Sequence, residues 1–516
     1  MDRKKKDMPE KDMIHPLNTG PKLLFAYETQ TLLDRHLILM GGGQGLRKHL
    51  VTTYYDSPDL LLRQSGLSLC IRRSGRQRIQ VLKVVGEKTR QASHREEWKW
   101  AIRTDRPDLS VLSDTPYGSQ VTGLNEKLVP VWVSDMQCVT HMIQYDGAMI
   151  EAVINAGDIR AGNARERVRR LELTFREGPE RALYSLALAI QAVVPLRLGV
   201  LTESDRGYHL LTGTSAVSRQ PGTPLLTKKM TPDNSFRALI CSGLHMLIQN
   251  QPAAEAGDPE GIHQMRVAIR QLRTMLQMIE GQYKDTDRST LRHFQSELRR
   301  IGRELGVARD WDVLCLETLP TAFAAQDGGD LIHMLDDAAQ EKRTTVHQQL
   351  CQELETPALI TLILSLAVWI ESADFPGAGK ERTVSVSRVA ATVLDRLARK
   401  VGRRGRHIRK LSPEERHALR KSLKKLRYGA HYFATLYPSH GIKSYMKRCK
   451  KLLRHLGEIN DATVATTLIR ILGQAHPDLA PVVGIFARWN DKRRNHALRA
   501  LPAAWKVFRH AGPFWR

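Results

Sequence analysis

Hydrophobic and polar positions in the second half of the chain follow helical spacing. In HQMRVAIRQLRTMLQMI, residues 263–279, apolar side chains gather on one side of a helix with about 100° per residue. The opposite side, an arc of roughly 80° at that spacing, holds His263, Arg266, Arg270 and Arg273. Solvated helix surfaces normally mix charges, because like charges one turn apart repel. The pattern therefore predicts an amphipathic helix with a cationic stripe, and a plain solvated face is the alternative.

The same stripe occurs a second time. HALRKSLKKLRYGAHYF, residues 417–433, repeats the offsets with His417, Arg420, Lys424 and Arg427, and its other side is again apolar. Each stripe is followed by a second matching element, residues 298–313 and residues 449–464. The stripes begin at 263 and 417 and the second elements at 298 and 449, so the copies lie 154 and 151 residues apart. We therefore predict an internal duplication of about 150 residues.

The first half of the chain alternates with period two instead. Stretches such as LSLCIRRS, RIQVLKVV, REEWKWAI and RVRRLELTF place charged side chains on one face, which predicts strands. A one-sided sheet facing water fits this alternation, and so does a barrel with a charged interior. The Gly-, Pro-, Ser- and Thr-rich run that starts at residue 212 predicts a linker to the helical part.

The charge balance narrows the choice of partner. The chain has 79 Lys and Arg against 54 Asp and Glu, a formal net charge of +25. The excess is +7 in residues 1–220 and +18 in residues 221–516. A surplus of this size favours a polyanionic partner such as nucleic acid, an anionic membrane or condensed phosphate.

Other features of composition argue against some of these partners. Only 6% of residues are aromatic, and the stripe helices carry few besides Tyr428 and Phe433. Binders of single-stranded nucleic acid add aromatic stacking platforms, whereas Arg and Lys bind phosphate oxygens without base contacts. The most apolar run, residues 357–370, is too short to span a bilayer and is predicted to be a buried helix. We therefore expect a chain of phosphates as partner, with no specific nucleic acid and no membrane.

The cysteines and the N-terminal residues bear on the compartment. Six cysteines are scattered without a CxxC pair, which favours a reducing compartment over a disulfide framework or zinc site. The first 20 residues are charged and lack the apolar core of a secretory signal. These features predict a cytoplasmic protein with a disordered tail at residues 1–20.

Five segments of the first half resemble the CYTH family of triphosphate tunnel enzymes, in order and spacing. They are YYDSPDLLLRQSGLSLCIRR, QVLK, REEW, LELTFREG and PLRLGVLTESDRGYHL. The resemblance implies an antiparallel β-barrel in which basic residues hold a triphosphate and glutamates hold Mg²⁺ or Mn²⁺. On this resemblance Arg72, Lys83, Arg95 and Arg206 would hold triphosphate, and Glu97 and Glu172 are the remaining candidate metal ligands.

The departures from the CYTH pattern affect its acidic positions. The family's first strand carries Glu-x-Glu-x-Lys, where this chain has Gly20, Lys22 and Leu24. Other departures are Arg170 and Thr174 in place of glutamates, Asn155 in place of aspartate, and Glu203 in place of lysine. Metal sites of this kind need several carboxylates. We therefore expect a retained barrel whose triphosphatase activity is lost or very weak, and an active enzyme that uses Mg²⁺ or Mn²⁺ is the alternative.

The second half resembles the CHAD family, through HQMRVAIRQLRTML, LGVARDWDVL, LRKSLKKLRYGAHYF and LGEINDATVA. The resemblance covers roughly residues 230–510 and implies a helical bundle with internal two-fold character that binds inorganic polyphosphate. Triphosphate and nucleoside triphosphates are further candidate ligands. Polyphosphate granules are a further candidate location. The expected polyphosphate-binding residues are His263, Arg266, Arg270, Arg273, Arg299, Arg300, Arg303, Arg309, His417, Arg420, Lys421, Lys424, Lys425, Arg427, Lys450, Lys451 and Arg454.

The duplication also contains two aspartates at matching positions. Asp310 and Asp461 are expected to orient neighbouring arginines or cap a helix rather than bind metal. The predicted fold class of the whole chain is α+β multidomain. The predicted parts are the tail at 1–20, the CYTH-like barrel at 21–211, the linker at 212–232, and the CHAD-like domain at 233–516 with repeats at about 233–370 and 384–510.

Overall fold

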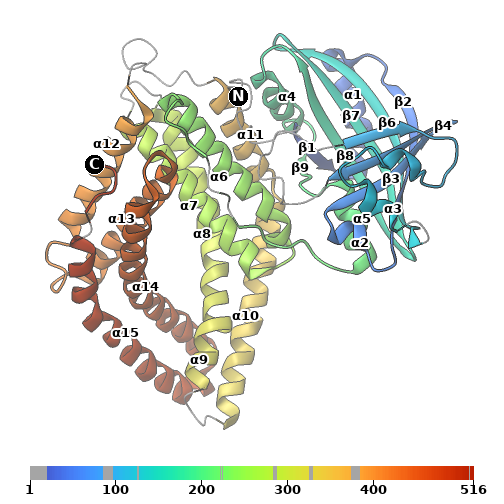
Figure 1. Cartoon of the computed structure of the whole chain (residues 1–516). Helices are drawn as coiled ribbons and strands as arrows, with labels where there is room; N and C mark the ends of the chain where they lie inside the picture. Colours follow the sequence, from blue (N-terminus) through green and yellow to red (C-terminus); the bar gives the residue numbers. More distant parts are fainter. Residues whose placement is uncertain are drawn as a thin grey trace. The chain divides into compact units, whose positions relative to one another are not determined.

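A computed structural model describes residues 20–84, 97–124, 127–220, 222, 225–282, 288–324, 329–372, 384–510 and 512–516. The chain divides into two compact units. The sheet unit comprises Met1–Val217 and Glu355–Ala373, and the helical unit comprises Ser218–Leu354 and Asp374–Arg516. Their content shows the predicted α+β multidomain class (Figure 1).

The sheet unit contains one antiparallel sheet. Its nine described strands pair in the order β5-β4-β3-β2-β6-β7-β8-β1-β9. The order leaves β5 and β9 at the edges, and no pairing in the described ranges joins them, so closure into a barrel is not confirmed. The strands are β1 Lys22–Phe25, β2 Leu46–Asp56, β3 Leu67–Ser74, β4 Gln77–Val84, β5 Glu97–Ala101, β6 Val129–Tyr145, β7 Ala148–Ala161, β8 Ala164–Glu177 and β9 Leu196–Leu198.

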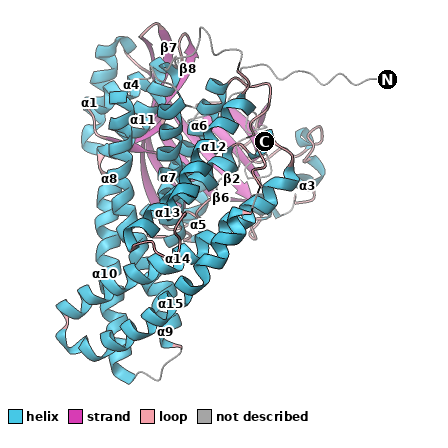
Figure 2. Cartoon of the chain, turned by 90° about the vertical axis from the view of Figure 1, so that its left-hand side faces the viewer, coloured by secondary structure: helices cyan, strands magenta, loops and turns pink. Residues whose placement is uncertain are grey.

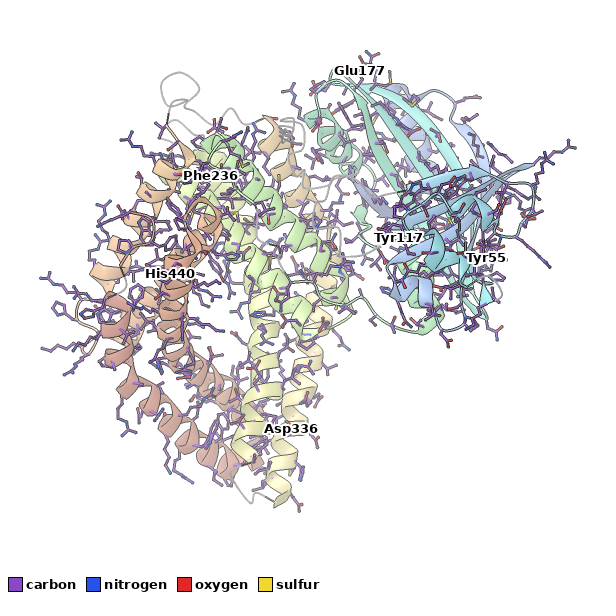
Figure 3. All side chains as sticks on the ribbon, in the orientation of Figure 1. Tyr55, Tyr117, Glu177, Phe236, Asp336 and His440 are labelled. Atoms are coloured by element: carbon purple, nitrogen blue, oxygen red, sulfur yellow. The ribbon has the colours of Figure 1, made fainter. Side chains whose placement is uncertain are left out.

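Aromatic side chains fill part of the core of this sheet. Tyr54 stacks on Trp132 with ring centroids 3.6 Å apart. Helix α5, Glu203–Thr212, packs against the same indole through Gly207, where an added Cβ would come within 2.2 Å of the Trp132 ring. A second cluster includes Tyr55 and Tyr117, both labelled in Figure 3. The indole thus fixes α5 against the sheet.

Five further helices belong to the sheet unit: α1 Gln30–Leu37, α2 Leu61–Gln64, α3 Gly118–Thr122, α4 Arg181–Gln191 and α11 Pro357–Ser372. The sequence places α11 in the first repeat as a buried helix, and it is a helix whose apolar residues are buried. It packs on α4 and β9, however, and so belongs to the sheet unit. A helix that is apolar around most of its circumference needs partners on several sides. The predicted range 233–516 therefore includes one helix of the other unit.

The helical unit is built from long helices that pack on their neighbours in sequence: α6 on α7, α7 on α8, α12 on α13, α13 on α14, and α14 on α15. Figure 2 shows α14 and α15 running side by side. Phe236 of α6, labelled in Figure 3, meets Phe433 edge-on at 6.4 Å between ring centroids. The helices are α6 Pro232–Glu255, α7 Pro259–Gln282, α8 Arg288–Val313, α9 Leu319–Phe323, α10 Gly329–Glu355, α12 Val386–Arg404, α13 Pro413–Tyr432, α14 Ser439–Ala475 and α15 Ala480–Arg509.

Part of the predicted linker is bound to the helical unit. The backbone N–H of Arg219 donates to Asn250 Oδ1 at 2.8 Å, and Asn250 Nδ2 donates to the carbonyl of Arg219. Leu226 is buried, and its carbonyl accepts from the Thr435 hydroxyl. Arg219 and Leu226 therefore pack with the helices instead of lying in a free connection.

No described helix is by itself both long enough and apolar enough to span a membrane. One bent pair, Asp330–Glu355 with Pro357–Ser372, meets both requirements jointly by length and composition.

Candidate anion-binding cavity

Both predicted stripe helices form, and in both the apolar side is buried. Helix α7 contains residues 263–279, and α13 contains most of the second copy. Helix α13 begins with a capping box in which the Ser412 hydroxyl accepts from the Glu415 N–H and the Glu415 carboxylate accepts from the Ser412 N–H. Met265, Ile269 and Leu272 of α7 are at most 1% exposed. Burial of the apolar sides fixes the rotation of each helix and therefore the direction of its stripe.

The two stripes meet at one cavity of about 610 Å³ in the helical unit. Helix α7 contributes His263, Arg266 and Arg270, and α13 contributes Arg420, Lys424 and Arg427. Arg309 of α8, another of the predicted site residues, also lines it. We call this space the two-stripe cavity. Its lining places cations that are about 150 residues apart in sequence around one space.

Two aspartates pair with arginines of the stripes. Asp310 Oδ1 of α8 lies 3.1 Å from Arg266 Nη1, and Asp461 Oδ1 of α14 lies 3.6 Å from Arg420 Nη2. A Cβ built on Gly306 would lie 3.6 Å from Arg266 Nη2, so the guanidinium packs over that glycine. These contacts confirm that the aspartates orient arginines. They also show that the stripes, which lack acids in their own helices, are partly compensated from neighbouring helices.

Lys424 lies among three arginines of the cavity lining, Arg266, Arg270 and Arg420. Burial lowers the pKa of its ammonium to about 6, and the charges of Arg270, Arg420 and Arg266 act in the same direction, against Asp461. No ion pair of Lys424, Arg270 or Arg427 occurs within the described ranges. Burial, with the repulsion of three arginines added to it, therefore favours a neutral Lys424 at pH 7 in the ligand-free cavity.

The two stripe histidines differ in position. His263 lines the cavity, and burial together with Arg309, Arg270 and Arg266 lowers its pKa to about 4. A ring nitrogen of His417 lies 3.0 Å from Asn460 Oδ1, and His417 is not part of the cavity lining. Burial is the main cause that lowers the pKa of His417. His417 thus has a local partner, whereas His263 faces the space that a ligand would enter.

The remaining predicted residues do not line the cavity. Arg300 pairs with Glu297 at 3.2 Å and with Glu353, and Arg454 Nε lies 3.8 Å from Glu458. Lys425 Nζ donates to Gln277 Oε1 at 2.5 Å, and burial lowers its pKa to about 8. Arg299 acts electrostatically on Arg273, whose pKa is lowered mainly by burial. The residues outside the lining are Arg273, Arg299, Arg300, Arg303, His417, Lys421, Lys425, Lys450, Lys451 and Arg454.

One end of the cavity was not predicted as part of the site. Tyr428 and His431 of α13 and Met446 of α14 also line it. The first two continue the stripe by one turn each, so helical spacing alone could have included them. Met446 carries no comparable signal, because its contribution depends on how α14 packs on α13.

In the sheet unit, the predicted basic residues share a carboxylate. Glu97 Oε1 lies 3.2 Å from Lys83 Nζ, 3.6 Å from Lys99 Nζ and 3.7 Å from Arg72 Nη1. Burial tends to raise the pKa of Glu97, but these three cations lower it overall. The structure therefore brings Arg72, Lys83 and Glu97 together, as the resemblance implied. Arg95 lies outside the described residues.

Strand β1 pairs with β8 in antiparallel register. Lys22 pairs with Glu172 and Leu24 with Arg170 across the β1–β8 ladder. Arg170 Nη2 lies 2.6 Å from Glu172 Oε1 and 3.8 Å from Glu203 Oε2.

The remaining predicted residue of the sheet unit, Arg206, lies in a separate ion pair with Glu166. Among the residues that the structure describes, no three His, Cys, Asp or Glu side chains are placed to hold a metal ion. Glu97, Glu166, Glu172 and Glu203 each lie within 4 Å of a basic side chain of the same unit.

Comparison with known proteins identifies the helical part. Residues 238–470 match the family model of the CHAD domain. This part of the chain is a CHAD domain. The crystal structure of the CHAD domain from the plant Ricinus communis has a TM-score of 0.50 and 24% identity to this chain, covering 58% of it and 98% of the plant chain. That likeness supports the fold of the CHAD domain.

Two further proteins are similar to the chain. A protein of Haemophilus influenzae (strain ATCC 51907 / DSM 11121 / KW20 / Rd) named inorganic triphosphatase is 22% identical over 168 residues, 31% of this chain and 46% of that protein. The match thus spans about half of that relative. PptA from Streptomyces chartreusis covers 54% of the chain and 100% of its own, at 13% identity and a TM-score of 0.43, too low to establish a shared fold. The predicted CYTH-type region joined to a CHAD domain is confirmed.

Proposed function

We propose that the CHAD domain binds inorganic polyphosphate in the two-stripe cavity. The observation that carries the proposal is the convergence of seven cationic or imidazole side chains from α7 and α13 on one space, of which only Arg266 and Arg420 form ion pairs in the described ranges. Cations held close together without sufficient counter-charge gain most from an anion that carries one charge per unit.

The geometry favours a flexible chain of phosphates over a nucleic acid. Arg266, Arg270 and Arg420 offer guanidinium forks, and Lys424 offers a point charge, all of which bind phosphate oxygens. Two stripes facing one cavity also raise affinity through effective concentration when one chain reaches both. A nucleic-acid strand stacks successive bases on a series of aromatic rings, and Tyr428 is the one Phe, Tyr or Trp among the described residues of the lining.

A competition experiment with the full chain tests this proposal. Long-chain polyphosphate and single-stranded DNA with the same total charge compete at fixed salt for the protein, with a fluorescent label on the polyphosphate. We expect polyphosphate to displace DNA with an affinity at least about tenfold higher, since no base contributes. Equal displacement by the two polyanions would support a general nucleic-acid binder instead.

For the sheet unit, we propose that triphosphatase activity is lost or very weak. The support is that Glu97, Glu172 and Glu203 each lie within 4 Å of an Arg or Lys nitrogen of the same unit. A carboxylate held by several cations is a poor ligand for a divalent ion. Phosphate release from triphosphate with Mg²⁺ or Mn²⁺ tests this, with Arg72→Ala plus Lys83→Ala as control. Turnover that needs metal and disappears in the control would contradict the proposal.

A second candidate is an active inorganic triphosphatase whose CHAD domain captures substrate. The grouping of Arg72, Lys83 and Glu97 on the sheet favours it, as does the similarity to a protein named inorganic triphosphatase. Either function is compatible with a cytoplasmic protein located at polyphosphate granules, and we propose this location for the leading function.

A further inference from the structure

The two-stripe cavity is asymmetric, although the sequence elements that form it are duplicated. Its lining continues along α13 from Lys424 to Tyr428 and His431. The matching positions of the first copy, 154 residues earlier, are Thr274 and Gln277, and neither lines the cavity. Thr274 is buried, and its hydroxyl donates to the Arg270 carbonyl at 2.8 Å. One end of the cavity therefore has an aromatic ring that the duplication does not supply at the other.

Tyr428 is held at that end by its neighbours on α13. It lies one turn after Lys424, and its ring is nearly parallel to that of Tyr432, at 17° and 6.4 Å between centroids. Tyr432 is 2% exposed and so provides a fixed support. Met446 of α14 lines the same cavity and adds a polarisable thioether, a group that packs well on aromatic rings. The cavity thus combines a cationic body with an aromatic and thioether end.

A chain of identical phosphate units can bind His431 at this end but gains nothing from a ring face or a thioether. A ligand with a phosphate chain at one end and a planar aromatic group at the other uses both parts. Arg270, Arg420 and Lys424 supply charge for the phosphates, and base–aromatic stacking is tolerant of which base is present. A single ring provides for a single base, so a nucleic acid would gain no more from it than a mononucleotide.

We propose that the two-stripe cavity also binds nucleoside polyphosphates, with the phosphates on Arg270, Arg420 and Lys424 and the base against Tyr428. This inference rests on the proposed phosphate-binding function of the cavity. It adds a ligand class and assigns Tyr428 the role of distinguishing a nucleoside-bearing phosphate chain from a bare one.

The test compares ATP with tripolyphosphate, without divalent metal, by calorimetry on the full chain. Tyr428→Leu should weaken ATP binding about tenfold, which is within the range for loss of one stacked base, and should change tripolyphosphate affinity less than twofold. Tyr428→Phe is the matched control, because it keeps the ring and removes the hydroxyl, and should retain ATP affinity. Circular dichroism of all variants reports the fold.

The outcomes separate this inference from the proposed function. Equal effects of Tyr428→Leu on both ligands, no effect on either, or no ATP binding by the wild type at millimolar concentration would each overturn the inference. Arg270→Glu with Lys424→Glu should abolish binding of both ligands to the cavity. If that variant binds tripolyphosphate and polyphosphate as the wild type does, the proposed function of the cavity is wrong, whatever Tyr428→Leu shows.

Discussion

The sheet unit and the helical unit both gather basic side chains, but they balance the charge differently. On the sheet, the carboxylate of Glu97 lies within 4 Å of Arg72, Lys83 and Lys99. The guanidinium of Arg170 lies within 4 Å of both Glu172 and Glu203. In the two-stripe cavity, Arg266, Arg309 and Arg420 have acidic partners, whereas no ion pair of Lys424 occurs in the described ranges, and the pKa of its ammonium falls to about 6.

The difference in charge balance between the two units indicates where an anion would bind. Cations that already have carboxylates gain little from a phosphate, because the phosphate must displace an existing partner. Cations that repel each other gain the full interaction and lose the repulsion. Local charge balance, more than the number of basic residues, therefore points to the helical unit as the stronger site.

The affinity of the two-stripe cavity for polyphosphate should depend strongly on pH. Without ligand, Lys424 loses its proton as the pH rises through about 6, and a bound polyanion raises its pKa. Binding above pH 6 then takes up a proton, so affinity falls as the pH rises, by up to about tenfold per pH unit. His263, with its pKa lowered to about 4, stays neutral in this range.

Calorimetry with long-chain polyphosphate from pH 6 to pH 8 in buffers of different ionisation enthalpy checks this prediction. Long chains are needed because terminal phosphates titrate near pH 6. Lys424→Arg should remove most of the dependence, because Arg stays charged throughout. A wild-type affinity that is constant over this range would show that Lys424 is already charged in the empty cavity.

A smaller effect is expected when the balance in the sheet unit is broken. Glu97→Gln removes the carboxylate shared by three cations and should raise triphosphate affinity of the sheet unit by about tenfold, measured without divalent metal. Arg270→Glu with Lys424→Glu in the same chain silences the helical site. Asp158→Asn is the matched control, because Asp158 also pairs with an arginine, Arg165, at 2.6 Å. Alternation along β7 turns Asp158 to the other face of the sheet from its buried neighbour Ile159. No gain from Glu97→Gln would mean that these cations are not limited by their carboxylate.

The smallest effect concerns cations that lie outside the cavity. Arg299→Glu with Lys450→Glu changes exposed side chains of α8 and α14 and should weaken long-chain polyphosphate about threefold, since fewer phosphates are neutralised. Triphosphate, which cannot extend beyond the cavity, should bind as it does to the wild type. A matching loss for both ligands, measured by calorimetry at one salt concentration, would place these residues at the main site instead.

The sequence predicted the individual helices better than their assembly. Helical spacing identified the stripes of α7 and α13, because one buried side fixes the rotation of each helix. It could not show that Arg270 and Lys424 face one cavity, since the spacing within a helix carries no information about its neighbour. Arg299 and Lys450 match between the copies and were predicted as site residues for that reason. They do not line the cavity, because each lies about three turns before the aspartate of its helix that does, Asp310 or Asp461.

The sheet unit shows the complementary case. The resemblance to a known family predicted that Arg72, Lys83 and Glu97 belong to one site. They lie on three different strands, and strand periodicity alone does not relate them to one another. The pairing of Arg170 with Glu203 was not predicted, because Glu203 belongs to α5 and reaches Arg170 only after that helix packs on Trp132. The membership of α11 in the sheet unit was missed because apolar composition predicts burial without naming the partner.

Binding in the two-stripe cavity is tested by the long-chain polyphosphate affinity after reversal of two of its three cations that lack an ion pair in the described ranges. Arg270→Glu with Lys424→Glu leaves the Arg266–Asp310 and Arg420–Asp461 pairs in place, so melting temperature should stay near that of the wild type. Lys492→Glu with Arg499→Glu on α15 makes the same two substitutions, one Lys and one Arg to Glu, at exposed residues outside the cavity.

Polyphosphate affinity should fall at least about a hundredfold in the cavity variant, and the salt dependence should become shallower, as expected when phosphate contacts are lost. The α15 variant should lose no more than about threefold through the change in overall charge. Equal losses in two folded variants would show that polyphosphate responds only to net charge and that the two-stripe cavity is not its binding site.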